Sequence, residues 1–136
     1  MRLTDKGKII FSPSDLIEFS MSPFASWMNH AYKIGKVTDA PGEASAEMKL
    51  LARMGDEHEK KVLDGYREIS AVCDLSPGKD FEERFAKTKE AIKRREKILY
   101  QAALRGGGFE GYSDFITLGA DGVYQIWVTK LARTPK

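Results

Sequence analysis

The sequence is poor in cysteine: Cys73 is the one cysteine among its 136 residues. A single thiol excludes a disulfide framework within the chain, and it excludes a four-cysteine zinc site or iron–sulfur cluster. Apolar runs are also short, because none approaches the ~20 residues that a membrane-spanning helix requires. The first residues carry no secretory signal pattern. These absences predict a cytoplasmic protein that has no membrane partner.

The chain also lacks a strong excess of charge of either sign. It carries 22 Lys and Arg against 20 Asp and Glu, which gives a formal net charge of +2 at pH 7. This balance does not by itself indicate a nucleic-acid partner. With 42% hydrophobic and 31% charged residues, the composition is that of an ordinary globular protein. The length suits a single domain with one modest core.

The first segment of that domain, residues 1–40, is predicted to be helical. The pairs Ser12-Pro13 and Ser22-Pro23 each favour a helix start. A serine oxygen can accept from free amides of the first turn, and a proline suits the first helical position. Residues 43–136 are predicted to form the remainder of the domain, with a long helix, a basic helix and a three-stranded sheet.

The long helix is predicted over residues 43–70. Its apolar positions recur at alternating spacings of three and four, as one buried face of a helix requires. These positions are Met48, Leu51, Gly55, His58, Val62, Tyr66 and Ile69. From spacing alone, His58 is more readily interpreted as a core histidine with one hydrogen-bonded nitrogen than as a metal ligand.

The rest of the chain is predicted to form one more helix and a sheet. Asp80 caps a helix that begins at Phe81 and carries many basic residues. Three strands follow, over residues 98–104, 109–118 and 123–132, as an antiparallel meander. The expected fold class is therefore α/β, of α+β connectivity, with helices packed on a small mixed or antiparallel sheet.

Two charged side chains, Asp114 and Lys130, interrupt the apolar runs of the last two strands. An isolated charge in such a run costs several kcal/mol unless it is paired or binds something, so both are candidates for function. A three-residue turn that ends at Gly122, in the left-handed conformation, would place Asp114 opposite Val128. Asp114 and Lys130 would then share one face within diagonal reach. A two-residue turn would instead pair Asp114 with Thr129, on the wrong face for Lys130.

Three short strings resemble, in this order and spacing, the RecB-like branch of the PD-(D/E)XK nuclease superfamily. They are Arg53-Met-Gly-Asp-Glu-His58-Glu59 on the long helix, Gly111-Tyr-Ser-Asp114-Phe on one strand, and Val128-Thr-Lys130-Leu-Ala-Arg133 on the next. The resemblance covers most of the chain from Arg53 to Lys136. It implies a restriction-endonuclease-like core. Because the further helix and strands usual for that core do not follow, the core is expected to be incomplete at its C-terminus.

The resemblance also implies a chemistry, the metal-assisted hydrolysis of DNA phosphodiester bonds. Asp114 would be a metal ligand, Lys130 the catalytic lysine, and His58 a further ligand or site-forming residue. The metal would be Mg²⁺ or Mn²⁺, which take hard oxygen ligands. No iron–sulfur cluster is expected, because Ser22 stands where many relatives carry a cysteine. The implied partners are DNA and the remainder of a longer nuclease or helicase polypeptide that acts in DNA repair.

One position departs from the family pattern: Val128 stands where Asp or Glu is expected. Valine cannot bind a metal, so the resemblance implies a nuclease whose activity is lowered or lost. Glu59, directly after His58, and Glu110, on the strand of Asp114, are candidates for replacing the missing ligand.

Basic residues near this site are candidates for contacts with DNA phosphates. They are Arg94 and Arg95 at the end of the basic helix, and Arg133 and Lys136 after the last strand. The other interpretation of the basic helix is an ordinary solvated surface.

Two further functions are compatible with the sequence. A non-catalytic module that binds DNA or another protein could use the same fold. A small α+β protein without a nucleic-acid role could use Asp114 and Lys130 as a simple ion pair.

Overall fold

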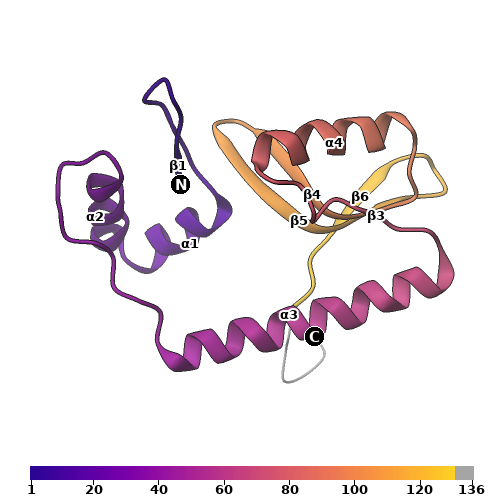
Figure 1. Ribbon diagram of the computed structural model, residues 1–136, viewed down its shortest axis with the longest axis horizontal. Helices are drawn as coiled ribbons and strands as arrows, with labels where there is room; N and C mark the ends of the chain where they lie inside the picture. Colours follow the sequence, from indigo (N-terminus) through magenta and orange to yellow (C-terminus); the bar gives the residue numbers. More distant parts are fainter. Residues whose placement is uncertain (131–136) are drawn as a thin grey trace. The chain divides into compact units, whose positions relative to one another are not determined.

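The computed structural model describes residues 1–130, which contain four helices and six strands. The helices are α1 (Pro13–Met21), α2 (Pro23–Lys33), α3 (Ala46–Ile69) and α4 (Phe81–Lys93) (Figure 1). The strands are β1 (Arg2–Leu3), β2 (Ile9–Ile10), β3 (Cys73–Asp74), β4 (Ile98–Gly106), β5 (Phe109–Leu118) and β6 (Tyr124–Trp127). The fold is thus mixed α+β, as predicted. None of the helices in this part of the chain is long and apolar enough to cross a membrane.

The chain divides into two compact units. The first unit contains residues 1–43 and 105–111, so it includes β1, β2, α1, α2 and the tip of the β4–β5 hairpin. The second unit contains residues 44–104 and the chain from residue 112 onward. It includes α3, α4 and most of the sheet.

In the first unit, both helices start where the sequence predicts. α1 begins at Pro13 after the N-cap Ser12, and α2 begins at Pro23 after the N-cap Ser22. The backbone amide of Ala25 donates to the Ser22 hydroxyl oxygen at 3.2 Å. This contact satisfies one of the free amides of the first turn of α2.

The second unit is built on a mixed sheet whose strand order is β3-β4-β5-β6. A small mixed or antiparallel sheet was predicted, and the sheet is mixed, because the short strand β3 pairs with β4 in parallel. Cys73 pairs with Leu99, and Asp74 pairs with Tyr100. The last strand also ends earlier than predicted, at Trp127.

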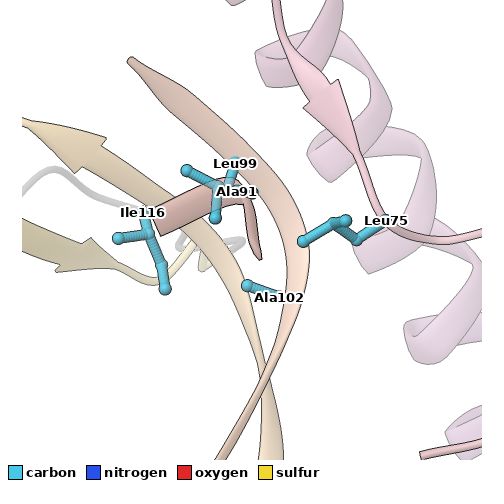
Figure 2. Close-up of a cluster of buried hydrophobic side chains, with 5 residues drawn as sticks. All are labelled: Leu75, Ala91, Leu99, Ala102 and Ile116. Atoms are coloured by element: carbon cyan, nitrogen blue, oxygen red, sulfur yellow. The ribbon is translucent and has the colours of Figure 1, made fainter. Parts of the chain in front are cut away.

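Two helices cover the second unit's sheet on opposite faces, α4 on one and α3 on the other (Figure 1). The core on the α4 side is a cluster of buried apolar residues from the helix, the sheet and the loop after β3. Its members are Leu75, Ala91, Leu99, Ala102 and Ile116 (Figure 2). The core on the α3 side is formed by Leu63, Ile98 and Phe115.

The apolar stripe predicted on α3 is buried only in part. Val62 and Tyr66 pack against the cluster of Phe115, but Leu63, which is not on the stripe, is the most buried residue of α3, at 5% exposed. Three stripe positions are largely exposed: Met48, Leu51 and Ile69. The prediction of one continuous buried face was therefore wrong, because only the segment around residues 62–66 packs in the core of the sheet.

The centre of β4 holds an unusual backbone conformation. Gln101 has a φ of 55°, in the left-handed region, which costs a residue other than glycine roughly 1–2 kcal/mol. Alternation along a regular strand would put Leu99 and Ala102 on opposite faces. Instead both belong to the core cluster on the α4 side. The left-handed residue between them explains this change of face.

Beside this irregularity, a buried threonine links α4 to the sheet. Thr88 is 1% exposed. Its hydroxyl donates to the Arg84 carbonyl oxygen at 2.8 Å and accepts from the Ala103 backbone amide at 3.0 Å. The threonine thus satisfies a buried backbone donor of β4, two residues after Gln101.

We expect Thr88→Val to lower the free energy of unfolding by about 1–3 kcal/mol, because it keeps the side-chain shape but leaves the Ala103 amide without its acceptor. Urea denaturation followed by circular dichroism measures the change. Thr88→Ser keeps the hydroxyl and is the matched control. A valine variant as stable as the parent would show that this hydrogen bond does not hold α4 on the sheet.

Candidate functional site

The turn between β5 and β6 sets the register of the candidate site. The Gly119 amide donates to the Val123 carbonyl at 2.8 Å, and Gly122 has a φ of 79°. This is the three-residue turn with a left-handed glycine that the sequence predicts. The ladder runs from Leu118 opposite Tyr124 to Phe115 opposite Trp127. One further step along this register places position 114 opposite position 128, as predicted.

The Asp114 carboxylate caps the end of this ladder. Its Oδ2 accepts from the backbone amide of Thr129 at 2.7 Å and from the Thr129 hydroxyl at 3.0 Å. In a continued ladder, a strand carbonyl would accept from that amide. Because ladder amides point along the sheet, the carboxylate lies near the plane of the sheet, past the end of β6. One oxygen of Asp114 therefore has two protein donors.

The two other positions of the strand motif are on the surface. Val128 is 58% exposed, and Lys130 is also exposed. In the described part of the chain, no ion pair joins the Lys130 ammonium to the Asp114 carboxylate. The simple ion pair considered from the sequence is therefore not formed there. Asp114 and Lys130 are related only by an extension of the β5–β6 register.

On α3, Glu59 contacts the centre of β4. Gln101 Nε2 donates to Glu59 Oε1 at 2.5 Å. Burial raises the pKa of the Tyr100 hydroxyl above its usual range, and a hydrogen bond to Glu59 and the charge of that carboxylate raise the pKa further. The charge of Asp114 acts on this pKa in the same direction.

His58 lies on α3 beside Glu59 and is partly buried. No hydrogen bond joins it to Asp114 within residues 1–130. Across the same residues, no three His, Cys, Asp or Glu side chains are placed together so that they could hold a metal ion. The metal ligands proposed from the sequence, Asp114, His58 and Glu59, are thus not assembled into one three-ligand group.

Glu110 cannot replace the missing acid, because it serves another purpose. It lies in the first unit and is 8% exposed. Its carboxylate accepts from Arg2 through both oxygens, at 2.5 and 2.9 Å, and from Arg105 at 3.0 Å. These hydrogen bonds, first of all those of Arg2, hold the pKa of Glu110 below its ordinary value against the opposing effect of burial.

The basic residues proposed to contact DNA differ in their surroundings. Arg94 is exposed and lies 3.4 Å from a Glu96 oxygen. Arg95 donates to the Gly122 carbonyl at 3.1 Å and lies over the Tyr124 ring. The two remaining candidates, Arg133 and Lys136, lie outside the described residues.

Three residues of this region were missed by sequence reasoning. Thr129 was considered only as a register marker, and nothing in its local sequence marks it as a partner of Asp114. Tyr100 and Gln101 carried a usable signal, since they are two polar residues at the centre of an otherwise apolar strand. A polar pair in such a position needs hydrogen-bond partners.

Comparison with known proteins assigns no relative. No protein-family model matches the chain, and no curated protein or solved structure matches it either.

We expect Glu110→Gln to lower the free energy of unfolding by about 2 kcal/mol at pH 7, because two arginines lose a buried charged acceptor. The folded-state pKa of Glu110 is lowered, so its contribution is present above about pH 4.5 and is lost as the pH falls through the lowered value. The difference between parent and variant should therefore shrink on acidification. Urea denaturation at pH 7 and at pH 3 tests this.

The exposed Glu57→Gln on α3 is the control, with no such change expected. A stability difference for Glu110→Gln that is the same at both pH values would contradict the assigned charge interaction.

Proposed function

We propose that this chain carries a DNA nuclease core of the RecB-like type, with a restriction-endonuclease-like arrangement, built for metal-dependent hydrolysis of phosphodiester bonds. The observation that carries the proposal is the β5–β6 register. Extended one step past its last pair, Phe115 with Trp127, this register would put Asp114 opposite position 128, with Lys130 two residues further along the chain. An acid on one strand facing an acid-x-lysine on the next is the arrangement that this chemistry uses.

The side chains present suit parts of that chemistry. Carboxylates such as Asp114 and Glu59 are hard oxygen ligands of the kind that Mg²⁺ and Mn²⁺ prefer. When bound, the metal supplies an activated water and neutralises charge on the phosphate. Thr129 orients the Asp114 carboxylate through two hydrogen bonds. The exposed Lys130 ammonium, three residues past the end of β6, can stabilise negative charge that develops on the phosphate.

Position 128 decides how far this function extends. Mg²⁺ is commonly held by one or two carboxylates together with water and substrate phosphates. Because residue 128 is valine, the position expected to face Asp114 carries no carboxylate. We therefore propose that this chain binds metal weakly and cleaves DNA slowly or not at all, while it keeps the strand geometry of a nuclease.

We expect Val128→Asp to tighten Mn²⁺ binding by at least about tenfold, because it adds a charged oxygen ligand opposite Asp114. It should also produce metal-dependent cleavage of a labelled DNA duplex. Isothermal calorimetry and gel electrophoresis provide the two measurements. Asparagine has nearly the same shape as aspartate but carries no charge, so Val128→Asn is the matched control.

If Val128→Asp and the parent bind Mn²⁺ equally and neither cleaves DNA, position 128 is not part of a metal site and the nuclease proposal fails. Cleavage by the parent itself would instead show that another acid has taken over this role.

A second candidate is a non-catalytic DNA-binding module on the same fold. It is favoured by one specific observation, which is that Asp114 Oδ2 already accepts two hydrogen bonds from Thr129. Such a module would depend on basic side chains that reach the DNA backbone. The C-terminal end of α4 offers them, since Lys93, Arg94, Arg95 and Lys97 are all exposed there.

For either function, we expect Arg94→Ala to weaken binding of a short DNA duplex and to lower the slope of log affinity against log salt by about one, because one phosphate contact is lost. Fluorescence anisotropy across a salt series measures both. Lys60→Ala, an exposed cation on α3, is the control. Equal losses for Arg94→Ala and Lys60→Ala would indicate a general effect of net charge and no defined contact.

A further inference from the structure

The strand β6 is an edge of the sheet that lacks common forms of edge protection. In the strand order β3-β4-β5-β6, it has a neighbouring strand on one side only within residues 1–130. From Gly122 to Thr129 the sequence contains no charged residue and no proline, two features by which natural edge strands avoid pairing with other chains. The opposite edge is better protected, since β3 has two residues and one of them, Asp74, is charged and pairs with Arg67.

The two ends of β6 show which of its backbone groups point outward. The Val123 carbonyl accepts from the Gly119 amide at 2.8 Å, and the Thr129 amide donates to the Asp114 carboxylate at 2.7 Å. Positions 123 and 129 therefore point toward β5. Because the direction alternates along an antiparallel ladder, every odd-numbered position between them also points toward β5. The amides and carbonyls of the three even-numbered positions point to the open side.

The side chains along this edge are apolar and largely exposed. Val123, Ile126, Trp127 and Val128 expose between 51% and 59% of their surface. Ile126 lies opposite Ile116, which belongs to the core cluster on the α4 side. The edge therefore continues an apolar core to the surface, and a further strand added there would cover it.

We propose that β6 pairs antiparallel with β6 of a second copy of this chain, about a two-fold axis at Ile126. Hydrogen bonds between the two strands must join outward-pointing positions, which are the even-numbered ones. With Ile126 opposite itself, Tyr124 lies opposite Val128, so all three of these positions are paired. The paired side chains are aromatic or β-branched, and no like charges meet. The same surface is used on both copies, as in most homodimers.

The area of this surface determines how strong the pairing is. Four half-exposed apolar side chains from each copy amount to roughly 500 Å² in the pair. This is below the ~1,200 Å² of a stable interface, so the dimer belongs to the weak and reversible class. The chain is therefore expected to be monomeric when dilute and to pair when concentrated.

Sedimentation velocity of the whole chain over a concentration series tests this pairing. We expect the parent to change from monomer to dimer between about 10 μM and 1 mM, the range of weak complexes. Ile126→Lys and Ile126→Glu should each weaken association by at least about tenfold, because identical charges would lie directly opposite each other. An equimolar mixture of the two variants should restore it. Ala52→Lys, at an exposed position on α3, adds the same charge elsewhere and is the control.

A second measurement needs no variant and therefore does not depend on how the variants fold. Hydrogen exchange followed by NMR should show that the amides of Ile126 and Val128 become protected as the parent is concentrated. The amides of Gln125 and Trp127 point toward β5, so their protection should not change with concentration.

The possible results support or overturn the proposal. A parent that stays monomeric over the whole series overturns it. A dimer that both Ile126 variants leave intact, or that forms without protection of the Ile126 amide, uses another surface and also overturns it. Association of the mixed variants, where neither associates alone, supports the two-fold axis at Ile126, and failure of the mixture to associate overturns it. Assemblies larger than a dimer overturn the closed pair, because one edge accepts one strand.

Discussion

The left-handed backbone of Gln101 governs how the sheet presents its side chains to the two helices. By breaking the alternation of β4, it lets both Leu99 and Ala102 enter the core on the α4 side. Two residues after it, the Ala103 amide bonds to the Thr88 hydroxyl, a contact between strand and helix. The conformational cost of roughly 1–2 kcal/mol is therefore offset by burial on one face and by hydrogen bonds at the helix contacts. A regular strand of this sequence would turn Ala102 away from α4 and leave Thr88 without that amide.

Acidic side chains in this fold are stabilised in two different ways, and the difference separates structural acids from candidate functional ones. Glu110 is nearly buried and is surrounded by permanent charges, since both of its oxygens accept from arginine side chains. A carboxylate held in this way has both oxygens occupied, because Arg2 and Arg105, which are partly exposed, donate to a nearly buried acceptor. Asp114 and Glu59 accept from neutral donors, Thr129 and Gln101. Neutral donors orient a carboxylate but do not cancel its charge, so these two acids can still attract a cation or repel a phosphate.

Local chemistry made much of this structure predictable, and long-range contacts account for most of what was missed. The helix starts at Pro13 and Pro23 and the turn at Gly122 follow from rules that involve a few neighbouring residues, and the turn then fixes the register opposite Asp114. The parallel pairing of β3 with β4 joins segments far apart in sequence, and two residues carry too little pattern to reveal it. Helical periodicity identified Val62 and Tyr66, which pack on the sheet. It could not show that other parts of the apolar stripe of α3 would extend beyond the sheet and stay exposed. The pairing of Arg2 with Glu110 spans 108 positions, and the strain at Gln101 depends on tertiary contacts that no local pattern encodes.

Val128 has a consequence for stability that is separate from its effect on chemistry. An acid at this position would face the Asp114 carboxylate across the strand pair, where like charges directly opposite each other are destabilising. Without a cation, two acids so placed would repel each other, and metal binding would recover the lost stability through linkage. Valine adds no charge at position 128, so Asp114 meets no like charge from that position.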